Sequence, residues 1–105
     1  MIQKLPLAST APVLIVGSVA YDTIITPAAT QEYILGGSAS YSSIAASYFA
    51  PVQLVGVVGH DFKKGFIDRF EHHGIDLQGL KISEKEKTFF WKGRYHENFN
   101  HRETL

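Results

Sequence analysis

Two adjacent glycines, Gly36 and Gly37, stand directly before a stretch of helical spacing. Without Cβ atoms, their backbone N–H groups can approach a small polar ligand closely, and the free N–H groups of a first helical turn add partial positive charge. The pair can therefore form the floor of a site for a hydroxyl-rich ligand. A tight turn with close helix–strand packing explains the pair equally well, because two glycines alone are weakly specific.

Asp22 is the second candidate, in the segment GSVAYD just beyond a predicted strand. In an open α/β sheet, ligands bind beyond the carboxyl ends of the strands, where helices begin. A carboxylate there can accept hydrogen bonds from two neighbouring hydroxyls, and bonds that involve a charged group contribute about 1.5–3 kcal/mol. An ordinary turn aspartate is the alternative. The segment VGVVGHDFKKG, residues 55–65, instead favours a structural strand–turn–helix joint, with Asp61 as the helix N-cap.

Composition argues against several other classes of protein. The five histidines lack the His-Glu-x-x-His spacing of a zinc helix, so we expect no metal site. Ten basic and ten acidic side chains give zero net charge, which argues against nucleic acid and anionic membranes as partners. No apolar run approaches the roughly 20 residues of a membrane helix. The absence of cysteine excludes a disulfide framework and is compatible with a cytoplasmic protein.

The order of the expected elements indicates the fold class. After a loose lead-in over residues 1–12, the sequence predicts helices at residues 38–50 and 62–73 and strands at residues 13–18, 19–26, 32–35, 52–59, 75–82 and 88–95. The β-branched run at 13–18 is typical of a strand buried on both faces. Alternating strands and helices imply an α/β sheet with helical crossovers. The 105 residues suffice for one small domain.

The first predicted helix has a regular apolar pattern. Its spacing places four side chains on one expected buried face: Tyr41, Ile44, Ala45 and Tyr48. Ser38 or Ser40 is expected to cap its start. In the second helix, phenylalanines at positions 62, 66 and 70 supply the apolar face, and Gly74 fits a C-terminal cap.

Three segments in this order resemble the N-terminal part of a PfkB/ribokinase-family sugar or nucleoside kinase. They are VGSVAYDTI, LGGSASYSSIAASYF and VQLVGVVGHDFKKGFIDRFEHHGIDLQGL. The resemblance extends from residue 13 to about residue 95. It rests on the combination of an Asp segment, a diglycine helix start, V-G-x-V-G-x-D-x-x-G and H-G-I-D, since any single piece is weak.

The resemblance implies a fold and a set of roles. The fold would be ribokinase-like (Rossmann-like), with a central sheet, helices on its faces and a small β-lid formed by residues 19–35 and 88–95. Members use ATP and a divalent metal such as Mg²⁺ to phosphorylate a hydroxymethyl group of a sugar, nucleoside or related alcohol. By analogy, Asp22 would hold substrate hydroxyls and Gly36 and Gly37 would line the pocket. The lid would close over the substrate, and an exposed lid would allow a homodimer.

Two departures from the family pattern concern the substrate pocket. The family often has Asn where this chain has Tyr41, and many of its sugar kinases have Asn where this chain has Ala20. The pocket is therefore expected to differ from that of ribokinase. Tyr41 would either stack on a ligand ring, as a substrate-binding residue, or pack in the core.

The chain lacks the Gly-Ala-Gly-Asp motif that carries the catalytic base in this family. We therefore expect no catalytic residue and no ATP-binding residue among residues 1–105, which we interpret as the N-terminal portion of a kinase, inactive alone. The alternative is a non-catalytic sugar-binding or dimerisation module of the same fold. An unrelated dinucleotide-binding enzyme is disfavoured, because no Gly-x-Gly-x-x-Gly follows the first strand.

Overall fold

The computed structural model describes residues 11–105, so nearly all of the expected lead-in lies outside the described residues. Two helices and seven strands follow in this order: β1 (Val13–Val16), β2 (Ala20–Ile25), β3 (Thr30–Gly36), α1 (Ser38–Ala46), β4 (Val52–Gly59), α2 (Lys64–His72), β5 (Asp76–Ser83), β6 (Phe89–Tyr95) and β7 (Arg102–Thr104). Every predicted strand and helix is present, with shorter helices than expected. The strand β7 was not predicted.

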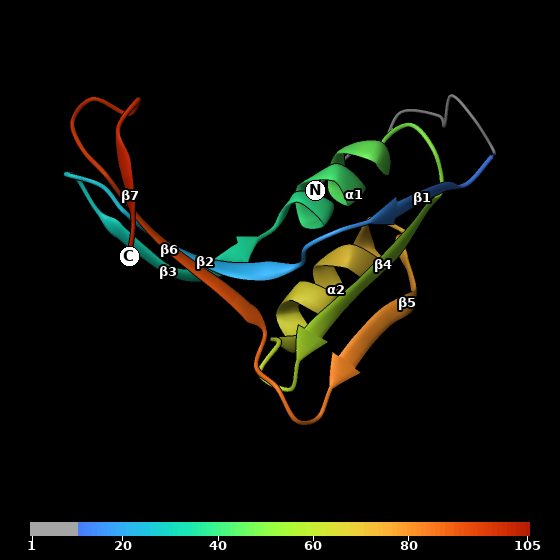
Figure 1. Ribbon diagram of the computed structural model, residues 1–105. Coiled ribbons are helices and arrows are strands. Elements are labelled where there is room, and N and C mark those ends of the chain that lie inside the picture. The colour runs from blue at the N-terminus through green and yellow to red at the C-terminus, as the bar shows by residue number, and fades with distance from the viewer. Residues whose placement is uncertain (1–10) are drawn as a thin grey trace.

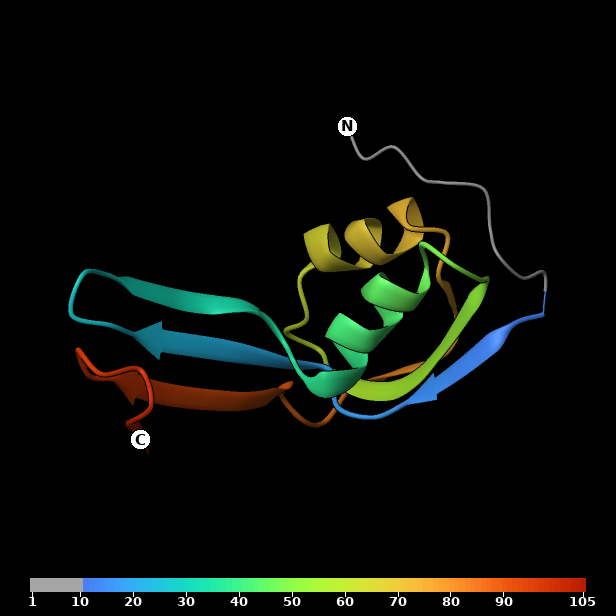
Figure 2. The ribbon, with the colours of Figure 1, turned by 90° about the horizontal axis from the view of Figure 1, so that it is seen from above.

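The first sheet has the order β1-β4-β5, and all three strands run parallel. Both helices cover the same face of this sheet, as Figures 1 and 2 show. The core lies between that face and the helices, with fully buried Leu54 and Phe70 at its centre. Parallel strands joined through helical crossovers confirm the expected α/β class.

The second sheet has the order β3-β2-β6-β7 and extends away from the helices (Figure 2). Strand β2 pairs antiparallel with β3 and parallel with β6. The two segments expected to form a lid, residues 19–35 and 88–95, thus lie side by side in one sheet. The polar tail adds β7, which pairs with β6 through the main chain while all three of its residues remain exposed.

The expectation that residues 13–18 are buried on both faces is wrong. Leu14 and Val16 are 59% and 69% exposed. Among the described strands, β1 pairs only with β4, and both helices lie on the opposite face of the sheet. Within residues 11–105, no element covers these two side chains.

The expected buried face of α1 is wrong at Tyr41 and Ala45, which are exposed, whereas Ile44 packs against the core. The helix buries the small residues Ala39, Ser40 and Ser43, whereas Tyr41 is 59% exposed. Small side chains allow the helix to lie close to β1 and β4, because a close approach leaves no room for larger ones. Tyr41 and Ala45 therefore lie on the outer side of this helix.

The start of each helix is fixed by tertiary contacts and not by the predicted caps. Neither Ser38 nor Ser40 caps α1. Instead, the Oγ atom of Ser18 accepts a hydrogen bond from the Ser38 N–H (3.1 Å), and the Ser18 carbonyl accepts one from the Ala39 N–H (3.0 Å). Helix α2 begins without a side-chain cap, so Asp61 does not have its expected role. Gly74, with φ of 72°, ends the second helix as predicted.

Candidate functional site

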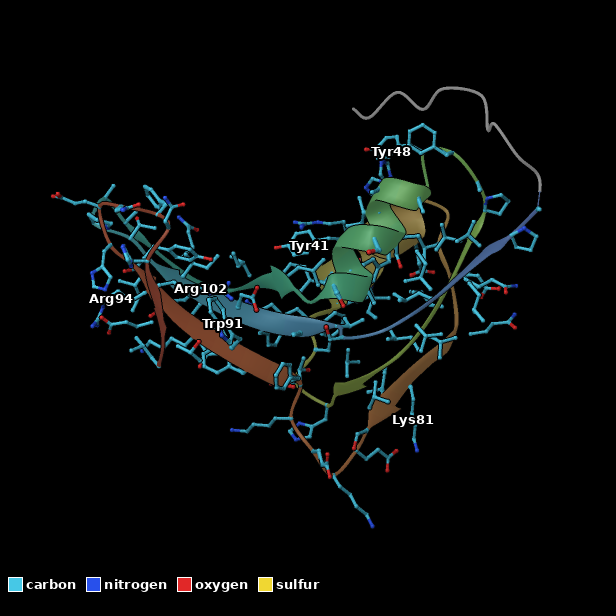
Figure 3. The ribbon with its side chains drawn as sticks, turned by 45° about the horizontal axis from the view of Figure 1, so that its top comes forward. Tyr41, Tyr48, Lys81, Trp91, Arg94 and Arg102 are labelled. Atoms are coloured by element: carbon cyan, nitrogen blue, oxygen red, sulfur yellow. The ribbon has the colours of Figure 1, made fainter. Side chains whose placement is uncertain are left out.

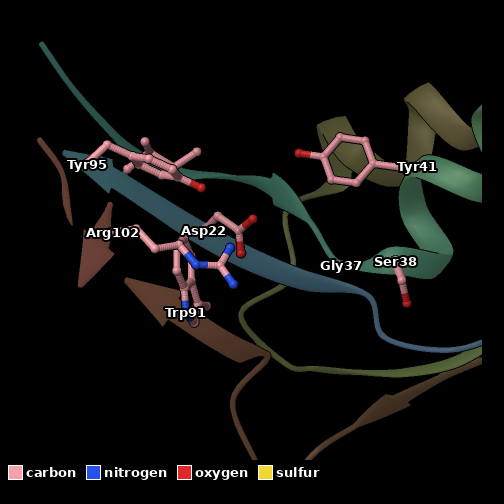
Figure 4. Close-up of a pocket in the computed structure, with 8 residues that line it drawn as sticks. Asp22, Gly37, Ser38, Tyr41, Trp91, Tyr95 and Arg102 are labelled. Carbon is pink, nitrogen blue, oxygen red and sulfur yellow. The ribbon is translucent and has the colours of Figure 1, made fainter. Parts of the chain in front are cut away.

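A cavity of about 410 Å³ lies where the second sheet meets the start of α1 (Figure 4). The second sheet contributes Asp22, Ile24, Trp91, Tyr95 and Arg102, and the start of α1 contributes Gly37, Ser38 and Tyr41. Three of the four predicted site residues, Asp22, Gly37 and Tyr41, are thus brought together around one hollow. The cavity has room for a small ligand and offers it both polar and aromatic walls.

Asp22 lies in β2, between Ile34 of β3 and Trp91 of β6. Its side chain is half-buried, and this burial raises the pKa of the carboxyl group above its ordinary value. Among residues 11–105, no group donates a hydrogen bond to this carboxylate. Both oxygens are therefore available to accept hydrogen bonds from a ligand in the cavity, which would also replace part of the lost hydration.

Gly36 does not line the cavity, in contrast to its expected position. It pairs with Ala20 across β2 and β3, behind the Asp22 side chain. A Cβ atom at this position would overlap the carboxyl group of Asp22. Gly36 therefore makes space for the carboxylate, so that its effect on the site is indirect.

Gly37 lies at the cavity and has a backbone conformation that favours glycine. Its φ is 94°, in the left-handed region, and it is the N-cap residue of α1. A Cβ atom here would overlap the carbonyl group of Ser18. The two glycines thus have different roles. Gly37 makes the tight turn and borders the cavity, and Gly36 leaves space for the Asp22 carboxyl group.

Tyr41 extends from α1 toward the strands of the second sheet (Figure 4). Its hydroxyl donates a hydrogen bond to the carbonyl of Leu35 (3.2 Å), which holds the ring at the cavity edge. With 59% of its surface exposed, Tyr41 is not a core residue. This exposure excludes packing in the core, and the ring borders the cavity.

Five lining residues were not predicted as site residues: Ile24, Ser38, Trp91, Tyr95 and Arg102. Figure 3 shows Trp91 and Arg102 together on the second sheet, with Tyr41 facing them. The Trp91 indole lies across Gly93, whose Cβ would overlap the ring, and donates a hydrogen bond to Oγ1 of Thr104 (3.3 Å). The Arg102 guanidinium lies 5.8 Å from the Trp91 ring centroid. The alternation along β6 places Trp91 and Tyr95 on one face, so this signal was present in the sequence.

Neither a protein-family model nor a curated protein matches the sequence. Solved structures do match. Ribokinase from Cryptococcus neoformans, solved with ADP, superposes with a TM-score of 0.75 at 21% identity, over 92% of this chain and 34% of that one. Ribokinase from Giardia lamblia gives a TM-score of 0.77 at 20% identity, over 92% of this chain and 33% of that one.

The fold is ribokinase-like. Nucleoside kinase from Burkholderia thailandensis, solved with inosine, also matches, with a TM-score of 0.75 at 20% identity over 90% of this chain and 35% of that one. The chain thus spans about a third of the length of these ribokinase-like proteins. The expected fold is confirmed at the level of structure.

The described part of this ribokinase-like chain has two further properties. No helix in residues 11–105 is long and apolar enough to cross a membrane. The same residues bring together no group of three or more acidic or histidine side chains that could hold a metal ion.

Proposed function

We propose that this chain is the substrate-binding N-terminal portion, over residues 1–105, of an ATP-dependent sugar or nucleoside kinase. One observation carries the proposal: the Asp22 carboxylate faces a cavity between the second sheet and α1 and has no hydrogen-bond donor among the described residues. In this proposal, Asp22 accepts hydrogen bonds from ligand hydroxyls, and Gly37 and Tyr41 form the opposite wall. The second sheet acts as the lid that excludes water from the bound alcohol.

In the proposed reaction, the γ-phosphoryl group of ATP passes to a hydroxymethyl oxygen, and the proton of that hydroxyl goes to a base. Phosphoryl transfer depends on positioning and on stabilisation of the developing charge. The chain contains no Gly-Ala-Gly-Asp segment, and residues 11–105 contain no cluster that fits Mg²⁺. We therefore assign the base, ATP and Mg²⁺ to a part of the fold outside these residues, and propose that the chain alone is inactive and cytoplasmic.

Replacing Asp22 by alanine is expected to weaken ligand binding by roughly 10- to 100-fold, because a hydrogen bond to a charged group contributes about 1.5–3 kcal/mol. The measurement uses Trp91, the single tryptophan of the chain, which lies in the cavity wall. Fluorescence is titrated with inosine and with D-ribose, and at least one is expected to change it saturably. The control Asp68→Ala removes an exposed carboxylate from α2 and should bind as the original chain does. Equal affinity in the Asp22 variant, or no saturable change with either ligand, would overturn the proposal.

A second proposed role, dimerisation through the lid, rests on two exposed rings. Tyr33 and Phe90 stack with centroids 5.1 Å apart on the face of the second sheet opposite Asp22, and they are 48% and 41% exposed. Tyr33 also has a φ of 51°, a conformation that costs a non-glycine residue about 1–3 kcal/mol. Aromatic residues are enriched in protein interfaces, where they lose contact with water.

We expect a homodimer in sedimentation velocity at micromolar concentration, and a monomer for the Phe90→Glu variant, because a buried unpaired charge opposes association. A Gln78→Glu variant, at an exposed position of β5 outside the second sheet, is the control for one added negative charge. It should still dimerise if the stacked rings form the contact. A monomeric original chain would contradict the proposed dimer.

A further inference from the structure

A hydrogen-bonded cluster joins the two sheets at the end of β4. The Tyr21 hydroxyl donates to the carbonyl of Asp61 (2.8 Å) and accepts from the Lys63 N–H (2.7 Å). The Asp61 carboxylate accepts from the Thr88 N–H (2.7 Å). The Thr88 Oγ1 atom accepts from the Gly59 N–H (3.0 Å). We call Tyr21, Asp61 and Thr88 the hinge cluster, because they link the second sheet to the loop between β4 and α2.

Two members of the hinge cluster, Tyr21 and Thr88, are buried as well as hydrogen-bonded. Tyr21 and Thr88 are only 2% and 5% exposed. The Tyr21 ring stacks on Phe62, with centroids 5.7 Å apart. A Cβ atom on Gly59 would overlap the backbone at Thr88, so the strand and the start of β6 approach as closely as glycine allows. The hydrogen bond from the Thr88 N–H lowers the pKa of Asp61, which favours the ionised carboxylate and a charge-assisted bond.

The position of Tyr21 in β2 connects this cluster to the cavity. Tyr21 and Asp22 are consecutive in one strand, so their side chains point to opposite faces of the second sheet. Tyr21 is tied to the loop before α2, while Asp22 faces the cavity. The opposite wall, with Gly37 and Tyr41, belongs to α1, which packs on the first sheet. The cluster therefore lies where a change in the angle between the sheets would move Asp22 relative to that wall.

We infer that the hinge cluster sets the angle of the second sheet, and that Tyr21 is a positioning residue for Asp22. The chain crosses between the sheets at residues 17–19, at Gly37 and at residues 84–88. Three single-stranded crossings alone would allow the sheet to rotate, whereas the hydrogen bonds of Tyr21 to Asp61 and Lys63 fix a fourth point. This inference rests on the proposed function only for the identity of the ligand, because the contact between the sheets is present when no ligand is bound.

The test uses Tyr21→Phe, which removes the hydroxyl and retains the ring on Phe62. Because the chain has no cysteine, Glu32 of β3 and Lys81 of β5, both exposed, can be replaced by cysteine to carry spin labels. Pulsed electron paramagnetic resonance, on labelled chain diluted with unlabelled chain, then measures the distribution of distances between the sheets. In Tyr21→Phe we expect a broader distribution with an unchanged far-UV circular dichroism spectrum. We also expect the affinity for inosine or D-ribose, measured by the fluorescence titration, to fall severalfold.

The matched control is Tyr33→Phe, in the same sheet. The Tyr33 hydroxyl makes no hydrogen bond within residues 11–105, so this variant should keep the original distribution. If Tyr21→Phe loses its circular dichroism signal, Thr88→Val provides the same test, since it removes the Oγ1 atom that accepts from the Gly59 N–H.

The outcomes separate this inference from the proposed function. A distribution in Tyr21→Phe as narrow as in the original chain would overturn the hinge, whatever the ligand titration shows. A broader distribution supports the hinge. If that broadening occurs in a chain that binds neither inosine nor D-ribose, the hinge is retained and the proposed ligand class is overturned.

Discussion

Replacing Gly37 by alanine is expected to lower the unfolding free energy by roughly 2–6 kcal/mol, the sum of a strained backbone and an overpacked contact. The φ of 94° opposes any L side chain, and the new Cβ would overlap the Ser18 carbonyl. That carbonyl also accepts the Ala39 N–H at 3.0 Å, so moving it would loosen the start of α1. Urea denaturation followed by circular dichroism measures the loss.

The control for this variant is Gly65→Ala in α2. A Cβ atom at Gly65 meets no atom within 4 Å, and the residue is helical. Alanine there should stabilise the chain by about 0.5 kcal/mol, because glycine loses more backbone entropy on folding. If both variants shift the urea midpoint equally, the special conformation of Gly37 is not the cause.

Replacing Gly36 by alanine is expected to damage the site through Asp22. The three atoms nearest to the new Cβ all belong to the Asp22 carboxyl group, so this side chain must rotate out of its position. We expect a loss of about 1–3 kcal/mol in stability. Ligand binding should fall by as much as in Asp22→Ala, roughly 10- to 100-fold.

A double-mutant cycle shows whether this loss runs through the carboxyl group. Asp22→Ala removes the three atoms that a Cβ at position 36 would meet. In that background, Gly36→Ala should cost little stability, which gives a coupling energy of about 1–3 kcal/mol between the two sites. Urea denaturation of the four chains measures it. Additive losses would mean that Gly36 is required for the backbone pairing of β2 and β3, and not for Asp22.

The α/β order was predictable because each strand and helix carries a local signal. The runs at β1 and β4 are rich in β-branched residues, and the diglycine marks the start of α1. The segments of the second sheet followed from the resemblance, and the structure brings them together. At β1, β4 and the start of α1, the structure formed is the one that the local residue pattern favours.

Local signals failed where tertiary contacts decide the outcome. Serine and alanine form the buried face of α1, and such small residues give a weak apolar period. Asp61 has the residue type of a helix cap, yet its carboxylate binds the Thr88 N–H, 27 residues away in the sequence. Arg102 reaches the cavity because β7 pairs with β6 through the main chain. The side chains of this polar strand show no alternation of apolar and polar residues that would predict it.

The uncovered face of the first sheet affects how efficiently the chain folds. Leu14, Val16 and Val57 are 59%, 69% and 58% exposed, and within residues 11–105 β1 has an unpaired backbone edge beside them. Exposed apolar strands of this kind pair with whatever strand or sheet they meet. The folding yield of the free chain should therefore depend on protein concentration, since self-association competes with specific covering of the face.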